Sequence, residues 1–405
     1  MSKKLLIIII AIFLLIWAVF FTIKKTPSNN EVVFWTLQMS DFAPYINGVI
    51  KDFETQNPDI KIKWVDVPFS EGEKRTLASV LSDNPPDLVN LNPDFSSTLA
   101  HKGALYEIPQ EKTVQFNKEI LNSLKTNGKL FSIPWYATSA ITIYNKDLIK
   151  KSEINIPQTY SQIAQNAKIV KDKTKAFIIL PNITENDTML KILNKYGCYG
   201  NNINSANCVK IFEMFKNLYS NNLIPKETVT ITLQEALEKY MSENIVMINA
   251  GANFLNMIKE NAPSAYTKTD IAPQIKGSLG QNDFSLMNFV IPLRAKHKDE
   301  ALKFVLFLTN NKNQLELAKL TNVLAVNNET LKNEFYTKYD KNDMLSKARV
   351  ISASQLNKLE PVFTTQRNQK EINNLVNNAV QNILLNKGKT QNILNKLAKN
   401  IKLLQ

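Results

Sequence analysis

Residues 128–147 read GKLFSIPWYATSAITIYNKD. An apolar run leads to Pro134 and to two aromatics, Trp135 and Tyr136, and a strand-like segment resumes at 141–144. Proline has no backbone N–H to donate, so we expect sheet pairing to break at Pro134 and to leave both aromatic rings exposed. Such a break fits a chain that leaves one domain for another, with a ligand cleft at the junction. An ordinary strand, bend and strand within one sheet explains the same residues equally well.

The composition describes a globular chain of more than one domain. Its 405 residues exceed one ordinary core and indicate about two to three domains. The formal net charge of +13 raises the question of nucleic acid, but the lysines are spread along the whole chain. No arginine-rich stripe, zinc pattern or RNA-binding aromatic motif accompanies them. We therefore expect no nucleic-acid partner.

The N-terminus carries a candidate membrane anchor. Residues 5–23 contain no charge, and these 19 residues (23 − 5 + 1) would form a helix of roughly 28 Å, close to one hydrocarbon core. A cleaved signal peptide usually has a shorter apolar core and a small-residue cleavage site, whereas this run ends in VFFTI. We predict an uncleaved signal anchor at 1–25 and a linker at 26–30, with atypical cleavage as the alternative.

The two cysteines, Cys198 and Cys208, lie ten positions apart in a turn-rich stretch. If this part of the chain is extracytoplasmic, a disulfide between them is chemically allowed. Cys208 also falls on one helical face with several apolar residues, so burial in the core is a second explanation. The sequence does not decide between a disulfide and simple burial in the core.

From residue 31 onward, short apolar strands alternate with amphipathic helices. Strand patterns occur at residues 32–35, 60–64, 87–91, 177–180 and 245–248. This order predicts parallel sheet with helices on its faces, and in such sheets ligands bind beyond the carboxyl ends of the strands. Polar and aromatic residues stand at those ends, at 35–41, 92–94 and 249–253. The last part of the chain, 372–401, predicts two amphipathic helices.

The chain shows no catalytic or metal-binding signature. Its two histidines, His101 and His297, are far apart, and no His/Cys cluster has metal-ligand spacing. A nucleophile elbow, a phosphate-cradling glycine loop and a dinucleotide fingerprint are all missing from the sequence. We expect no metal and no cofactor. What remains is aromatics and amides at strand ends, which suit neutral polar solutes because rings stack on sugar faces and amides hydrogen-bond hydroxyls.

Five short motifs follow one another along the chain: DLV at 87–89, GKL at 128–130 with YNKDL at 144–148, PQTY at 157–160, IVMIN at 245–249, and HKDEA at 297–301. In this order and spacing they resemble the extracytoplasmic solute-binding proteins of ABC importers. The similarity is to the sugar-binding family 1, the branch that includes maltose-binding protein, and it covers almost everything after the predicted anchor.

The resemblance implies an α/β fold of two lobes, the type II periplasmic-binding-protein fold, in which solute binds between lobes that close by hinge motion. Transferred to this chain, the two lobes would be formed by residues 31–137 with 289–340, and by residues 138–288 with 341–405. The three crossings between the lobes would fall near residues 138–140, 283–288 and 339–343.

The candidate solute-binding residues come from the strand ends and from the positions that match the family: Trp35, Asp41, Asn92, Asp94, Trp135, Tyr136, Thr138, Asn249, Asn253, Asn288 and Phe363. The match is partial. Leu91 stands where maltodextrin binders have a stacking tryptophan, and Thr138 stands where they have a cleft carboxylate. These departures argue against a long glucan. A smaller sugar is the preferred solute class, and glycerol-phosphate-like or other polar solutes are the alternatives.

The resemblance further implies a receptor that captures a small polar solute and delivers it to the permease of an ABC importer. We expect a bacterial monomer, anchored to the cytoplasmic membrane by its N-terminal helix, with the binding domain extracytoplasmic. Because fold does not fix function, two alternatives remain. One is a ligand-sensing subunit for a membrane signalling partner, and the other is a glycan-active enzyme on the same fold.

Overall fold

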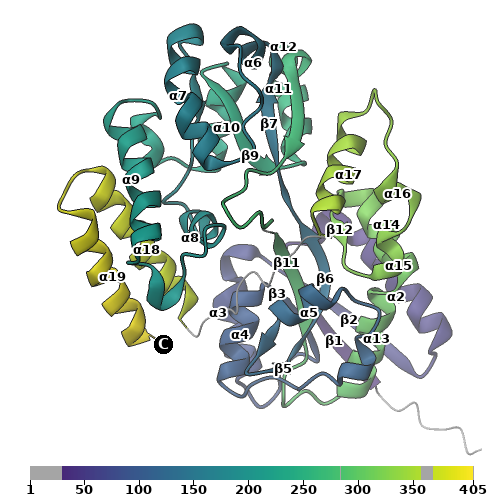
Figure 1. The fold of residues 1–405 in the computed structure, drawn as a ribbon. Coiled ribbons are helices and arrows are strands. Elements are labelled where there is room, and N and C mark those ends of the chain that lie inside the picture. Colours follow the sequence, from purple (N-terminus) through teal and green to yellow (C-terminus); the bar gives the residue numbers. More distant parts are fainter. Residues whose placement is uncertain (1–29, 283, 357–367, 405) are drawn as a thin grey trace, which may run out of the picture.

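The structure is a computed structural model that describes residues 30–282, 284–356 and 368–404. Within these residues the chain forms two lobes, each with its own β-sheet covered by helices (Figure 1). The predicted two-lobed α/β architecture is therefore present. No helix of the described ranges is both long and apolar enough to cross a bilayer. The predicted anchor, residues 1–25, lies outside the described residues.

The first lobe holds a six-stranded sheet in the order β12-β6-β11-β3-β1-β2. Its strands are β1 (Asn30–Leu37), β2 (Ile60–Val67), β3 (Leu88–Leu91), β6 (Ser132–Thr138), β11 (Ser285–Val290) and β12 (Leu324–Ala325). Its helices are α2 (Ala43–Gln56), α3 (Phe69–Val80), α4 (Pro93–His101), α5 (Lys118–Ser123), α13 (Lys298–Leu308), α14 (Asn311–Thr321), α15 (Asn328–Leu331) and α16 (Glu334–Thr337). A short hairpin, β4 (Lys125–Thr126) with β5 (Lys129–Leu130), precedes β6.

The sheet of the first lobe combines parallel and antiparallel pairs, and aromatic side chains pack on it. β1 pairs in parallel with β2 and with β3, as the alternation of strands and helices predicts, whereas β11 runs antiparallel to β3 and β6. Phe34 of β1 is fully buried, and its ring lies 5.7 Å from that of Phe289 and 5.3 Å from that of Phe304. The aromatic cluster fixes α13 against the sheet.

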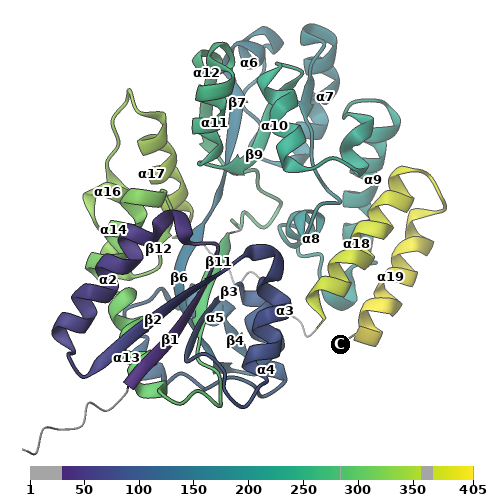
Figure 2. The same cartoon turned by 180° about the vertical axis from the view of Figure 1, so that it is seen from behind.

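The second lobe holds a four-stranded sheet in the order β10-β7-β9-β8. Its strands are β7 (Ala140–Asn145), β8 (Phe177–Ile179), β9 (Ile245–Gly251) and β10 (Thr269–Pro273). Helices around it are α6 (Lys146–Ser152), α7 (Tyr160–Thr174), α8 (Thr188–Asn194), α9 (Ala206–Ser220), α10 (Leu233–Met241), α11 (Phe254–Asn261), α12 (Pro263–Lys268), α18 (Gln369–Leu384) and α19 (Thr390–Leu404). The last two helices pack on the outside of this lobe (Figure 2).

The chain passes between the sheets at few points. β6 ends at Thr138 and β7 begins at Ala140, so Ser139 alone separates a strand of the first sheet from a strand of the second. The chain returns between β10 and β11. Later, α17 (Met344–Leu356) follows the first-lobe helices and packs against β7 and β10 of the second lobe.

The predicted break at Pro134 is wrong. β6 continues through Pro134, which lies opposite Asn288 of β11. The register shifts at the next residue: Met287 pairs with Tyr136 and Asn288 with Pro134, so Trp135 is an extra residue of β6. A one-residue bulge in β6 beside Pro134 therefore accommodates the missing donor without ending the strand.

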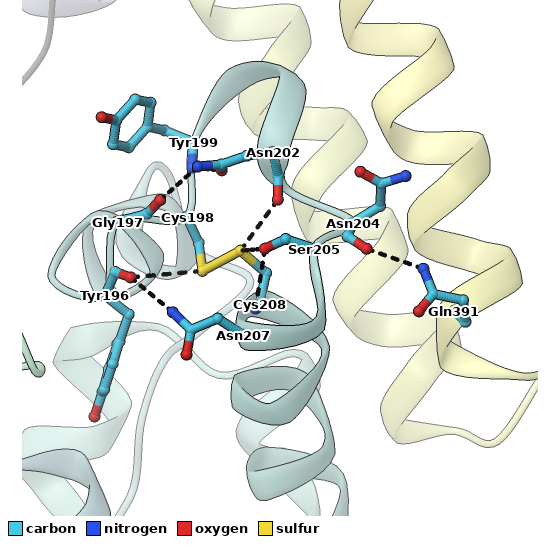
Figure 3. The surroundings of a disulfide bond; sticks show 10 residues. All are labelled: Tyr196, Gly197, Cys198, Tyr199, Asn202, Asn204, Ser205, Asn207, Cys208 and Gln391. Carbon is cyan, nitrogen blue, oxygen red and sulfur yellow. Dashed lines mark hydrogen bonds between the residues drawn. A yellow bond between two sulfur atoms is a disulfide. The ribbon is translucent and has the colours of Figure 1, made fainter.

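Cys198 and Cys208 form a disulfide at the start of α9 (Figure 3). Both residues are buried, so the cystine is also part of the second-lobe core. The loop that it closes contacts α19: Asn204 donates from Nδ2 to Oδ1 of Asn395 over 2.9 Å, and its carbonyl accepts from Gln391 Nε2 over 2.9 Å. The disulfide therefore holds the surface on which the C-terminal helix rests.

Candidate functional site

A cavity of about 330 Å³, here called the inner cavity, lies where the second sheet meets the crossings. The carboxyl ends of the parallel strands β8 and β9 open into it, as does the first residue of β7. Thr138 and Ser139 from the first crossing and Phe284 and Ser285 from the second complete the wall. The chain therefore builds a pocket between its two lobes, at the sheet edge where α/β proteins bind ligands.

The inner cavity is lined mainly by uncharged polar groups and by apolar side chains, most of them Ile and Leu. Asn249 of β9 lines it, and its Oδ1 is buried without a hydrogen-bond partner among the described residues. Asn253 stands at the start of α11, with its Oδ1 over Gly251, where a Cβ would collide with that oxygen. Glycine at 251 thus lets an amide close over the end of β9. A buried acceptor without a partner is energetically costly, so a hydrogen-bond donor that reached Asn249 Oδ1 would be favoured there.

Lys191 of α8 is the one ionised side chain among the described residues of the inner cavity wall. Its Nζ lies 3.1 Å from Asp187 and 3.4 Å from Ser285 Oγ. The pair with Asp187 offsets its charge, and the contact with Ser285 links α8 to the first strand residue after the second crossing. The cavity thus combines a mostly uncharged wall with one cationic side chain among its described residues.

A larger cavity of about 1140 Å³, the outer groove, continues from the inner cavity and shares Lys191, Phe284 and Ser285 with it. It runs between α4 of the first lobe and α8 and α18 of the second. Asn373, Asn374 and Asn377 of α18 line one side, and charged residues of both signs line the rest. The two cavities form one continuous space between the lobes.

Five of the predicted solute-binding residues line this space. Thr138, Asn249 and Asn253 border the inner cavity, and Asn92 and Asp94 border the outer groove. Asn92 has a structural role as well, because its Oδ1 accepts from the Phe95 backbone N–H over 2.8 Å and caps α4.

Trp135 and Tyr136 line neither cavity, and the expectation that both rings are exposed is wrong. Trp135 is fully buried, with its ring 4.7 Å from Phe289 and its carbonyl accepting from Gln314 Nε2 over 2.9 Å. Tyr136 packs beside it, and burial raises the pKa of its hydroxyl to about 12. Because β6 does not end at Pro134, Trp135 stays within the strand, and its ring packs in the first-lobe core.

The other four predicted residues either do not line the two cavities or are not fully described by the structure. Trp35 is half-buried under the guanidinium of Arg75, whose Cζ lies 5.1 Å from the ring centre. Asn288 is fully buried within β11. Asp41 belongs to the short helix Ser40–Phe42, but its side chain is not described, and Phe363 lies outside the described residues.

Sequence reasoning missed several residues of the inner cavity wall: Tyr160, Asn182, Thr188, Lys191, Phe284 and Ser285. Asn182 had a usable signal, because it stands in the polar loop that follows β8. Lys191 had none, since it is one lysine among many on an amphipathic helix and only the packing of α8 turns it inward. Among the described residues, no group of three or more His, Cys, Asp or Glu side chains is arranged to hold a metal ion.

A buried polar cluster lies directly behind the inner cavity wall. Gln355 of α17 and Gln274, which follows β10, both donate from Nε2 to Ser139 Oγ, over 2.9 and 3.1 Å. Oε1 of Gln355 accepts from the Gln274 backbone N–H over 2.7 Å. All three residues are buried. The cluster therefore joins the segments by which the chain passes between the lobes.

Comparison with known proteins agrees with this architecture. The sequence profile of the family described as "Bacterial extracellular solute-binding protein" matches residues 38–315. The "Multiple sugar-binding protein" of Streptococcus mutans is 26% identical over 316 residues, which cover 71% of this chain and 73% of that protein. The "Galactooligosaccharide-binding protein" of Bacillus subtilis is 22% identical, with 72% and 71% covered.

Solved structures show the same fold. A putative oligosaccharide periplasmic-binding protein from Synechococcus sp. MITs9220 is 25% identical and superposes with a TM-score of 0.84 over 91% of this chain and 98% of that one. A cyclo/maltodextrin-binding protein complexed with maltotetraose is 18% identical, with a TM-score of 0.76 over 93% and 97%. The family profile covers more than half of the sequence. The chain belongs to the family of bacterial extracellular solute-binding proteins.

Proposed function

We propose that this protein is an extracytoplasmic receptor that binds a small sugar between its lobes and delivers it to an ABC importer. The observation that carries the proposal is the inner cavity, with its amide and hydroxyl groups, its Lys191 paired with Asp187, and its place at the carboxyl edge of the second sheet. Its volume lies at the lower end of the range common for small-molecule sites.

The chemistry of the wall favours a neutral polyhydroxylated solute. Asn249 supplies an acceptor, Lys191 supplies a donor, and Phe284 supplies a ring at the junction of the inner cavity with the outer groove. The printed names of two relatives, a multiple sugar-binding protein and a galactooligosaccharide-binding protein, point to the same solute class. The outer groove leaves room for a second sugar unit beyond the first.

Delivery to an importer, anchoring by residues 1–25 and an extracytoplasmic position belong to the same proposal. Membership of an extracellular solute-binding family supports the position, and the uncharged run at 5–23 supports the anchor.

A thermal-shift screen of the full chain tests the solute class. Mono- and oligosaccharides, polyols and polyol phosphates are added singly, and a true solute at 100 times its Kd stabilises the folded state by about 2.7 kcal/mol. Titration calorimetry then gives the affinity for each hit. A panel in which no saccharide raises Tm, or in which only polyol phosphates do, would remove sugar as the solute class.

A further inference from the structure

α19 forms an outer edge of the second lobe in both views (Figures 1 and 2). Leu394, Leu397 and Ile401 are buried on its inner face, which packs against α18, α9 and the cystine loop. The opposite face is exposed. Its residues are Asn392, Asn395, Lys396, Lys399, Lys402 and Leu403.

These exposed residues form one continuous stripe. At 3.6 residues per turn they fall within about 120° of the helix circumference. Lys396, Lys399 and Leu403 follow the spacing i, i+3 and i+7 along its middle. Leu403 is 76% exposed and so presents a large apolar side chain to solvent among these lysines. We call Lys396, Lys399, Lys402 and Leu403 the α19 basic face.

The charge on this face is not compensated locally. Residues 372–404 contain five lysines and no aspartate or glutamate. Among the described residues, no carboxylate lies within ion-pair distance of Lys396, Lys399 or Lys402. Elsewhere on the molecule the exposed lysines are often paired, as Lys338 is with Glu334.

We propose that the α19 basic face docks on the anionic headgroups of a lipid bilayer. Lysines on a helix face reach phosphate-bearing headgroups with their ammonium groups while their stems lie along the surface. Leu403, between them, can enter the boundary between headgroups and acyl chains. A soluble polyanion would match the lysines equally well but would leave Leu403 in water, so the combination favours a membrane surface.

This inference rests on the anchor of the proposed function, which would bring the domain close to a bilayer. β1 begins at Asn30, and six residues, 24–29, separate it from the uncharged run that ends at Ile23. A tethered domain stays near the membrane at high effective concentration, so a weak attraction between the α19 basic face and the lipid is sufficient for docking. Each lysine near an anionic surface strengthens association about fivefold at low ionic strength.

The test uses the full chain in nanodiscs of phosphatidylcholine alone or of phosphatidylcholine mixed equally with phosphatidylglycerol. A nitrobenzoxadiazole dye is attached at Leu403→Cys, and separately at Val114→Cys, a first-lobe position of matched exposure (78%). The native cysteines are joined in the disulfide and leave the introduced thiol unique. We expect blue-shifted emission and quenching by lipid-borne quenchers for the Leu403 label only, in the anionic discs only.

Charge variants complete the test. Lys396→Gln/Lys399→Gln/Lys402→Gln should reduce the fraction of docked protein at least tenfold, and raising salt to about 1 M should do the same because the Debye length falls to about 3 Å. The control Lys146→Gln/Lys150→Gln/Lys151→Gln removes the same charge from exposed lysines of α6 and should change nothing. The proposal is overturned by an unshifted Leu403 label in anionic discs, by an equal shift at Val114, or by an equal shift with soluble polyglutamate and no bilayer.

Discussion

Gln355 donates from Nε2 to Ser139 Oγ over 2.9 Å, and so joins the end of α17 to the single residue that separates β6 from β7. The same amide group donates to the carbonyl of Ala140 and accepts from the backbone of Gln274. Ser139 also lines the inner cavity. One buried side chain therefore connects three chain segments between the lobes to the wall of the proposed solute site.

Replacing Gln355 with alanine should lower both stability and solute affinity. It leaves buried groups without partners, which costs about 1–3 kcal/mol, and it frees the crossings whose geometry shapes the cavity. Gln314→Ala is the matched control, because Gln314 is also buried and holds three backbone groups, but within the first lobe. Denaturant unfolding and calorimetry separate the two effects. Equal loss of affinity in both variants would show that the cluster has no special link to binding.

Asn249→Leu should leave stability unchanged or improve it, and should weaken solute binding at least tenfold. The reason is that the replacement removes a buried oxygen without a partner, which helps the empty protein but deprives the solute of an acceptor. Asn288→Leu is the matched control, since both polar atoms of Asn288 are buried without partners but lie outside the cavities. Melting temperatures with and without solute provide the readout. Strong binding by the Asn249 variant would move the site elsewhere.

Trp135→Ala should act on the fold and not on solute contacts. Removing a fully buried indole leaves a cavity, and such changes reduce stability by about 3–5 kcal/mol. The fraction of molecules that remains folded should bind solute with affinity within a factor of two of the original. Urea unfolding and calorimetry at low temperature measure the two quantities. A stable variant with tenfold weaker binding would restore the original expectation of a stacking tryptophan.

Loss of the disulfide should loosen α19 before the rest of the second lobe. Cys198→Ser/Cys208→Ser is expected to reduce stability by about 2–4 kcal/mol, because it removes a constraint on the unfolded chain. Since Asn204 in the cystine loop bonds to Gln391 and Asn395, hydrogen exchange should rise first in α19. Dithiothreitol should reproduce the change in Tm. Uniform exchange across the lobe would contradict the role given to this loop.

Stability should fall with acidification through Asp270. Burial alone would raise the pKa of this carboxyl, but the Lys347 ammonium and the Ile271 backbone N–H hold it below its ordinary value. A depressed carboxyl pKa stabilises the fold above about pH 4 and loses that contribution as the pH drops further. Asp270→Asn should therefore flatten the pH dependence of Tm between about pH 5 and pH 3. A variant that keeps the original slope would assign the acid sensitivity to other groups.

The fold was predictable because its signals are local and repeat along the chain. Alternation of apolar strands with amphipathic helices predicts β1 to β3, and the YNKDL motif marks the end of β7 and the start of α6 in the second lobe. Amides at strand ends likewise predicted Asn249, which β9 carries to the cavity.

The rest of the site depends on contacts between distant segments. Trp135 was misplaced because β6 absorbs Pro134 in a one-residue bulge while it pairs with β11, a strand some 150 residues later in the chain (287 − 135 = 152). Lys191 and Ser285 meet only when α8 and β11 are packed together, so neither has a signature of its own. Hydrophobic periodicity identifies buried faces, but it does not identify which polar residue of a helix faces a cavity.

Ser139, the single residue between β6 and β7, also limits which insertions and deletions the protein can tolerate. Because side chains alternate along a strand, one residue added or deleted at Ser139 would shift the phase of β7 relative to β6. Ile141 and Ile143 would exchange faces with Thr142 and Tyr144, which are also buried, unless the local backbone absorbed the difference. Surface loops of the same protein can gain or lose residues, but an insertion or deletion here inverts a strand and removes the polar cluster behind it. We expect position 139 to tolerate a substitution far better than an insertion or a deletion.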